Sequence, residues 1–167
     1  MKLIFLHGGD ICVENVETED GEVTSLTVAQ LIMYNLAQDE LSFSLPIYNK
    51  VLSEAAELTG VTGMDNLRHF TQHPDYDISS LALQLTNEEI MKSEKELTQS
   101  PQQLFDSANH LLLDFRNEYL KMRLDQLRRD IAEAKDDAQK QQQLIAELQM
   151  INKQRAIIAK RIGSCVR

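Results

Sequence analysis

The chain has 167 residues, 43% of them hydrophobic and 26% charged, and a formal net charge of −9 at pH 7. This composition is near the average of globular proteins, so we do not expect disorder. The acidic balance argues against binding nucleic acid over the whole surface. No apolar run approaches the roughly 18 to 20 residues that span a bilayer, and two cysteines are too few for a disulfide framework. We therefore expect a soluble, cytoplasmic protein.

The first 26 residues are the least helical part of the sequence. Strand-like segments at 2–6, 11–16 and 22–26 are separated by Gly8-Gly9-Asp10 and Asp20-Gly21, which are turn signals. The pattern predicts short strands, with a small β-hairpin near residues 11–26. Residues 2–7 have a second interpretation, as the stub of a truncated helix.

Apolar residues recur at helical spacing through the middle of the chain. Ser25 or Thr27 can cap the first of these helices, Pro46 suits the first position of the second, and Asp77 or Ser79 can cap the fourth. The predicted helices cover about 28–40, 46–59, 64–72 and 79–85, followed by one more turn through Ile90 and Met91.

From Pro101 an apolar stripe continues with no glycine or proline before Gly163. It predicts a helix from Pro101 to Lys135, about 52 Å long at ~1.5 Å per residue. Asp136-Asp137 is the natural break, and a second stripe at heptad steps predicts another helix over 144–162, capped by Gly163. The fold class is therefore mostly α, with a helical bundle at 1–115 and a C-terminal helical hairpin at 116–167.

A search for catalytic and metal-binding patterns gives little. His69 and His73 have the i, i+4 spacing of metal ligands, but Phe70 stands where the metalloprotease motif has glutamate, so we expect polar histidines at a helix end. His7-Gly8-Gly9-Asp10 has no accompanying nucleophile elbow. We expect no catalytic residue, no cofactor and no metal.

The C-terminal hairpin is the remaining candidate for a functional site. Its basic residues are interleaved with acidic residues at pairing distance, which is typical of a solvated helix and not of a nucleic-acid site. Two helices alone bury little surface, so the hairpin must dock on its own bundle, a second copy or another protein. Met150 and Ile157 lie beside the apolar stripe, which gives the last helix enough apolar surface for two contact faces.

Several segments together resemble a known family. The run Tyr119-Leu-Lys-Met-Arg-Leu-Asp-Gln-Leu-Arg-Arg, and the helix from Leu144 to Ile162 that ends Ala-Lys-Arg-Ile-Gly, resemble the C-terminus of bacterial replicative primases of the DnaG type. Similar segments precede them in the same order over about residues 10–163, namely Thr27-Val-Ala-Gln-Leu-Ile, Gln38-Asp-Glu-Leu-Ser-Phe, Pro46-Ile-Tyr, Phe70-Thr-Gln-His-Pro-Asp and Ile78-Ser-Ser-Leu-Ala.

The resemblance implies a helicase-binding domain, in which a helical bundle precedes a helical hairpin. Both parts are similar in fold to the N-terminal domain of the hexameric replicative helicase, and the hairpin docks on that domain and recruits the primase to the fork. The zinc-binding and polymerase domains of the family have no counterpart in this chain, so we expect no primer synthesis from it. The segment 11–26 departs from the generic bundle.

The helicase-binding residues that we expect all lie in the last helix. The apolar ones are contacts or part of the hairpin seam, and the charged ones form a rim. They are Leu148, Ile151, Arg155, Ile158, Lys160, Arg161 and Ile162. The alternative hypothesis is a self-associating coiled-coil or adaptor protein that forms a dimer through its hairpin or by a domain swap at a hinge near Glu118.

Overall fold

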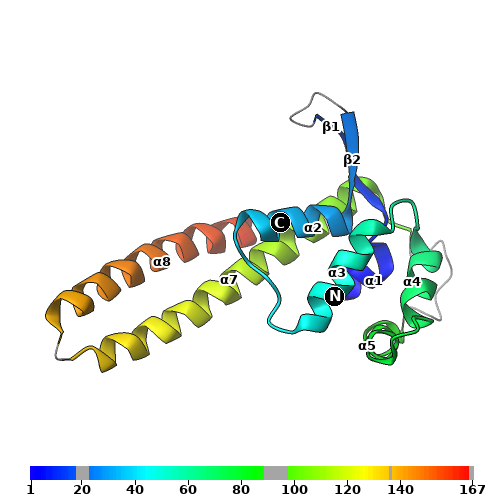
Figure 1. The fold of residues 1–167 in the computed structure, drawn as a ribbon. Coiled ribbons are helices and arrows are strands. Elements are labelled where there is room, and N and C mark those ends of the chain that lie inside the picture. The colour runs from blue at the N-terminus through cyan, green and yellow to red at the C-terminus, as the bar shows by residue number, and fades with distance from the viewer. Residues whose placement is uncertain (18–22, 89–97, 136, 166–167) are drawn as a thin grey trace. The chain divides into compact units, whose positions relative to one another are not determined.

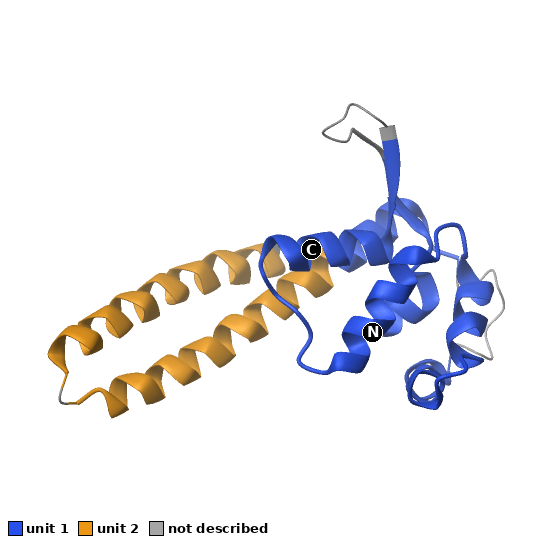
Figure 2. Ribbon diagram, viewed as in Figure 1, with its two compact units in different colours: residues 1–108 blue, residues 109–167 orange. Residues whose placement is uncertain are grey.

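The computed structural model describes residues 1–17, 23–88, 98–135 and 137–165. It is mostly helical with one small antiparallel sheet, which confirms the predicted fold class (Figure 1). The chain divides into two compact units, residues 1–108 and 109–167, hereafter the bundle unit and the hairpin unit (Figure 2). The boundary between them falls inside one long helix, as does the boundary predicted at 115/116.

Two strands and seven helices are described. They are α1 (Lys2–His7), β1 (Ile11–Glu17), β2 (Val23–Thr27), α2 (Val28–Gln38), α3 (Pro46–Glu57), α4 (Gly63–Thr71), α5 (Tyr76–Thr86), α7 (Pro101–Glu133) and α8 (Ala138–Cys165). Within the described residues, none of the helices combines the length and the apolar character that crossing a membrane requires. The turn predicted through Ile90 and Met91 lies outside the described residues.

Residues 2–6 form part of a helix, so the strand predicted there is wrong. Four of the six residues of α1, Ile4 to His7, are buried in succession. Because successive helical side chains point about 100° apart, such a run is buried only when neighbours surround the helix on every side. Helix α1 meets this condition, because α2, α3, α4 and α5 all pack against it.

The predicted β-hairpin is confirmed. β1 pairs antiparallel with β2, with Ile11 opposite Thr27 and Val16 opposite Thr24, and the register shifts between these pairs. The turn residues 18–22 lie outside the described part of the chain. Thr27 ends β2 and also begins α2, since its side chain accepts the Gln30 N–H while the Gln30 side chain accepts the Thr27 N–H, a complete capping box.

The bundle unit is held by an apolar core that includes an aromatic pair. Phe5 of α1 and Phe70 of α4 meet edge to face, with ring centroids 5.2 Å apart, and both are fully buried. Pro46 is the first residue of α3, as predicted. The cap predicted for α5 at Asp77 or Ser79 is wrong, because the helix begins earlier and Asp75 accepts the Asp77 N–H.

The hairpin unit consists of the C-terminal part of α7 and the whole of α8. Asp137 precedes α8 and its carboxylate accepts the Lys140 N–H, which is consistent with the predicted break at 136–137. The prediction that Gly163 ends the helix is wrong, because α8 continues to Cys165. A single glycine costs only about 1 kcal/mol in a helix and does not stop one that is otherwise favourable.

Candidate functional site

The hairpin unit is closed by one apolar seam between α7 and α8. Leu124, Leu127 and Ile151 are the buried residues of this seam, with exposed fractions of 1%, 0% and 5%. Leu120, Leu144 and Leu148 pack around them. Two of the predicted helicase-binding residues, Leu148 and Ile151, therefore lie in the seam and hold the hairpin together.

Polar contacts accompany the seam. The Arg123 side chain donates two hydrogen bonds to Glu147 Oε1, at 3.0 and 2.7 Å, and the pKa of Arg123 is raised first by these bonds and then by the charge of Glu147. Arg155 Nε donates to Asn117 Oδ1 at 3.2 Å. Arg155 was predicted as part of a charged rim, and here it links the two helices.

The other predicted residues lie near the end of α8. Ile158 and Ile162 continue the heptad spacing of Ile151 and are half-buried, while Lys160 and Arg161 are exposed. The seven residues therefore do not form one surface. The apolar ones follow the inner face of α8, and the two exposed charges lie outside it.

A second apolar stripe lies on the outer face of α8. Met150 and Ile157 are 55% and 56% exposed, seven residues apart, and about 100° around the helix from Ile151. Lys153 lies three residues after Met150, and Lys160 lies three residues after Ile157; both lysines are exposed. We call Met150, Lys153, Ile157 and Lys160 the outer α8 stripe. An exposed stripe of this kind is a typical protein contact surface, with apolar groups at its centre and charges beside them.

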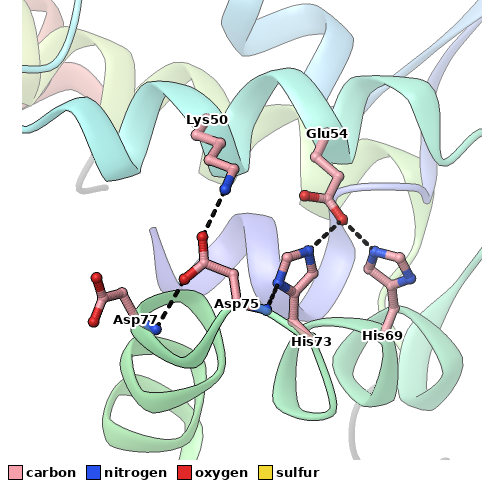
Figure 3. A network of polar contacts seen from close by, with 6 residues as sticks. All are labelled: Lys50, Glu54, His69, His73, Asp75 and Asp77. Carbon is pink, nitrogen blue, oxygen red and sulfur yellow. Dashed lines mark hydrogen bonds and ion pairs between the residues drawn. The ribbon is translucent and has the colours of Figure 1, made fainter.

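The bundle unit contains a cluster of two histidines and one glutamate (Figure 3). Glu54 on α3 places Oε1 2.6 Å from His69 Nε2 and 3.1 Å from His73 Nε2. His69 lies in the last turn of α4, and His73 follows two residues after the helix ends. Their side chains are 25%, 35% and 11% exposed, in the order Glu54, His69, His73. Within the part of the chain that the structure describes, this is the group of three side chains that could hold a metal ion.

Asp75 extends this network beside His73. Its backbone N–H donates to His73 Nδ1 at 3.0 Å, so the proton of a neutral His73 ring lies on Nε2, facing Glu54. Lys50 Nζ lies 2.6 Å from Asp75 Oδ2. This hydrogen bond is the largest cause of the lowered pKa of the Asp75 carboxyl group and of the raised pKa of Lys50. Lys50 and Glu54, one turn apart on α3, thus contact the segment from His69 to Asp75.

Sequence reasoning found the two histidines of the cluster but missed the glutamate. A linear motif places the carboxylate next to the first histidine, whereas Glu54 comes from a different helix. The sequence feature that could have pointed to Glu54 is its i, i+4 spacing from Lys50, which puts both side chains on one face of α3.

His7 and Cys12 are also buried in the bundle unit. His7, 2% exposed, has Nδ1 2.6 Å from Asp10 Oδ2. The Cys12 thiol donates to the Leu26 carbonyl oxygen, and burial raises its pKa to about 11. A thiol with so high a pKa is a poor nucleophile at neutral pH, so Cys12 serves as a small core residue.

Comparison with known families gives one match. Residues 1–166 match the family described as "Domain of unknown function (DUF8430)". The chain belongs to this family. The curated proteins and the solved structures yield no match.

Proposed function

We propose that this DUF8430 chain is a protein-binding domain that docks on the N-terminal domain of the hexameric replicative helicase, as the C-terminal domain of a DnaG-type primase does. In this role it recruits primer synthesis to the replication fork in the cytoplasm and catalyses no reaction itself. The serial resemblance of its motifs supports the proposal. A bundle unit followed by a hairpin unit is also the arrangement that the resemblance implies.

The observation that carries the proposal is that α8 has two apolar faces. The inner face, with Ile151 at 5% exposure, is used by the seam with α7. The outer α8 stripe is not used in this way, since Met150 and Ile157 remain more than half exposed. A helix that packs on one side and exposes medium-sized apolar groups on another is suited to receive a second protein.

The side chains of the outer α8 stripe indicate what kind of surface its partner should have. Met150 and Ile157 can enter an apolar groove, while Lys153 and Lys160 favour a groove with carboxylates at its edge. The helicase surface should therefore be apolar with an acidic border. In this account Leu148, Ile151 and Arg155 act indirectly by fixing α8 against α7.

Calorimetric titration against the isolated N-terminal domain of the cognate helicase, at moderate salt, tests the proposal. Ile157→Asp places a charge in the outer α8 stripe without touching the seam, and should weaken binding by about tenfold or more, which corresponds to ~1.4 kcal/mol. Lys50→Ala, in the bundle unit, is the control and should bind like the unchanged chain. Equal affinities for both variants, with helicity preserved, would contradict the proposal.

Self-association is the second candidate function, and α7 provides its basis. Leu111, Tyr119 and Met122 of the hairpin unit are 48%, 41% and 57% exposed. They follow helical spacing on the side of α7 away from Leu124 and Leu127. A dimer at micromolar concentration, measured by light scattering and abolished by Met122→Asp, would favour this function, whereas a monomer would exclude it.

A further inference from the structure

The cluster of Glu54, His69 and His73 leads to an inference that is independent of the proposed function. We propose that these three side chains bind a Zn²⁺ ion on the bundle unit. The three ligand atoms, Glu54 Oε1 and the Nε2 atoms of both histidines, lie within 4.8 Å of one another. They come from α3, from the C-terminal half of α4 and from the turn that follows α4 (Figure 3).

The distances fit an ion with small adjustments. Zn²⁺ bonds to histidine nitrogen and carboxylate oxygen are about 2.0–2.2 Å long, so the ligand atoms of a tetrahedral site are roughly 3.3 Å apart. The separation of Glu54 Oε1 from His73 Nε2 is already 3.1 Å, and that from His69 Nε2 is 2.6 Å. Opening the distance from Glu54 Oε1 to His69 Nε2 by less than about 1 Å brings both carboxylate–imidazole separations to this value. The two histidine nitrogens lie within 4.8 Å of each other.

The kinds of ligand also point to Zn²⁺. Two imidazoles and one carboxylate suit a borderline metal ion, whereas Mg²⁺ and Ca²⁺ prefer oxygen ligands only. Glu54 and His69 are 25% and 35% exposed, so water can reach the ion and complete its coordination. The single negative charge of Glu54 partly neutralises the ion, while the neighbouring Asp75 carboxylate is paired with Lys50.

The Asp75 N–H gives this site a distinctive signature. A metal-bound His73 Nε2 carries no proton, so the proton of the neutral ring moves to Nδ1. Nδ1 then can no longer accept the Asp75 N–H, which it does at 3.0 Å. Zn²⁺ binding must therefore break this hydrogen bond at the N-cap of α5. The lost bond weakens the site relative to one without this contact.

Titration of the full chain with Zn²⁺ by calorimetry, and with Co²⁺ by visible absorption, tests the proposal. We expect one ion per chain and the absorption bands of a cobalt ion with nitrogen and oxygen ligands. Glu54→Gln and His69→Gln should each weaken binding about tenfold or more. In the ¹H–¹⁵N correlation NMR spectrum of the chain, the Asp75 amide signal should shift as Zn²⁺ is added.

Two matched variants separate the site from general effects. His110→Gln removes a partly exposed histidine of the hairpin unit, which lies 3.5 Å from Asp114, and should leave Zn²⁺ binding unchanged. Lys50→Met removes the neighbouring contact to Asp75 but no ligand, and should also retain binding. The proposal is overturned if no saturable binding occurs, if His110→Gln weakens binding as much as His69→Gln, or if the Asp75 amide signal does not move.

Discussion

The two units of the chain obtain their cores in different ways. In the bundle unit, α1 is surrounded by four other helices, so Phe5 and Phe70 are fully buried by contacts from several parts of the sequence. The hairpin unit depends on one seam, with Leu124, Leu127 and Ile151 at its centre. A unit with so narrow a core leaves apolar side chains on its other faces. In the proposed function, the bundle unit is the more firmly packed part and the hairpin unit carries the contact surface.

A substitution in the bundle unit should show how tightly that unit is packed. Gly9 is buried, and a Cβ there would overlap with the backbone carbonyl oxygens of Val61 and Leu58, which cannot move aside cheaply. Gly9→Ala should lower the free energy of unfolding by roughly 3 kcal/mol or more. Urea unfolding monitored by circular dichroism measures this change.

Gly163→Ala is the matched control, because nothing lies within 4 Å of a Cβ at that position in α8. Alanine is the better helix former, so the control should be neutral or stabilising by up to about 1 kcal/mol. If Gly9→Ala were as harmless as Gly163→Ala, the described packing between the α1–β1 turn and the segment after α3 would be wrong.

The seam is the corresponding weak point of the hairpin unit. Leu127→Ala removes a fully buried side chain and should cost about 2–3 kcal/mol, the lower part of the range for such changes, because two helices can partly close the gap. Met122→Ala, on the exposed side of the same helix, should change stability by less than about 0.5 kcal/mol.

Hydrogen exchange locates the effect of Leu127→Ala. Protection should fall in α8 and in the part of α7 beyond residue 109, while the amides of α1 and α4 keep theirs. Uniform loss of protection over both units would contradict the separation of the two cores.

Particular residues show what the sequence could and could not predict. The long helices α7 and α8 follow from an uninterrupted apolar stripe, and the β-hairpin follows from its turn signals. Helix α1 is too short to show a period, and its burial on all sides removes the polar face that would have marked it as helical. The pairing of Glu54 with His69 and His73 depends on how the bundle unit brings α3 beside the segment from His69 to His73, which no local pattern records.

The alkylation rate of the Cys12 thiol measures how often the bundle unit exposes it to solvent. Burial raises the pKa of its thiol to about 11, against 9.0 without burial, so its reaction with iodoacetamide at pH 8 should be about 100-fold slower in the folded chain than in urea. A Cys165→Ser background restricts the reaction to Cys12. Equal rates in the folded and unfolded chain would show that β1 does not bury the thiol.

The Lys50–Asp75 ion pair should have the smallest effect, because Lys50 is exposed and Asp75 half-buried, so water screens the pair. The pKa of Asp75 is lowered in the folded chain, so the pair contributes stability above the unfolded pKa of about 3.9 and loses it as the pH falls through the folded pKa. Lys50→Met should therefore make the urea midpoint fall less between pH 7 and pH 3. An identical fall in the unchanged chain and the variant would contradict this assignment.

The central claim, that the outer α8 stripe is the docking surface for a replicative helicase, is tested most directly by mapping the contact on the isotope-labelled chain. Adding the unlabelled N-terminal domain of the cognate helicase should shift or broaden the amide signals around Met150, Lys153, Ile157 and Lys160, and leave those of α1 and α4 in place. Signals that change only in the bundle unit, or no change at saturating helicase domain, would contradict the claim.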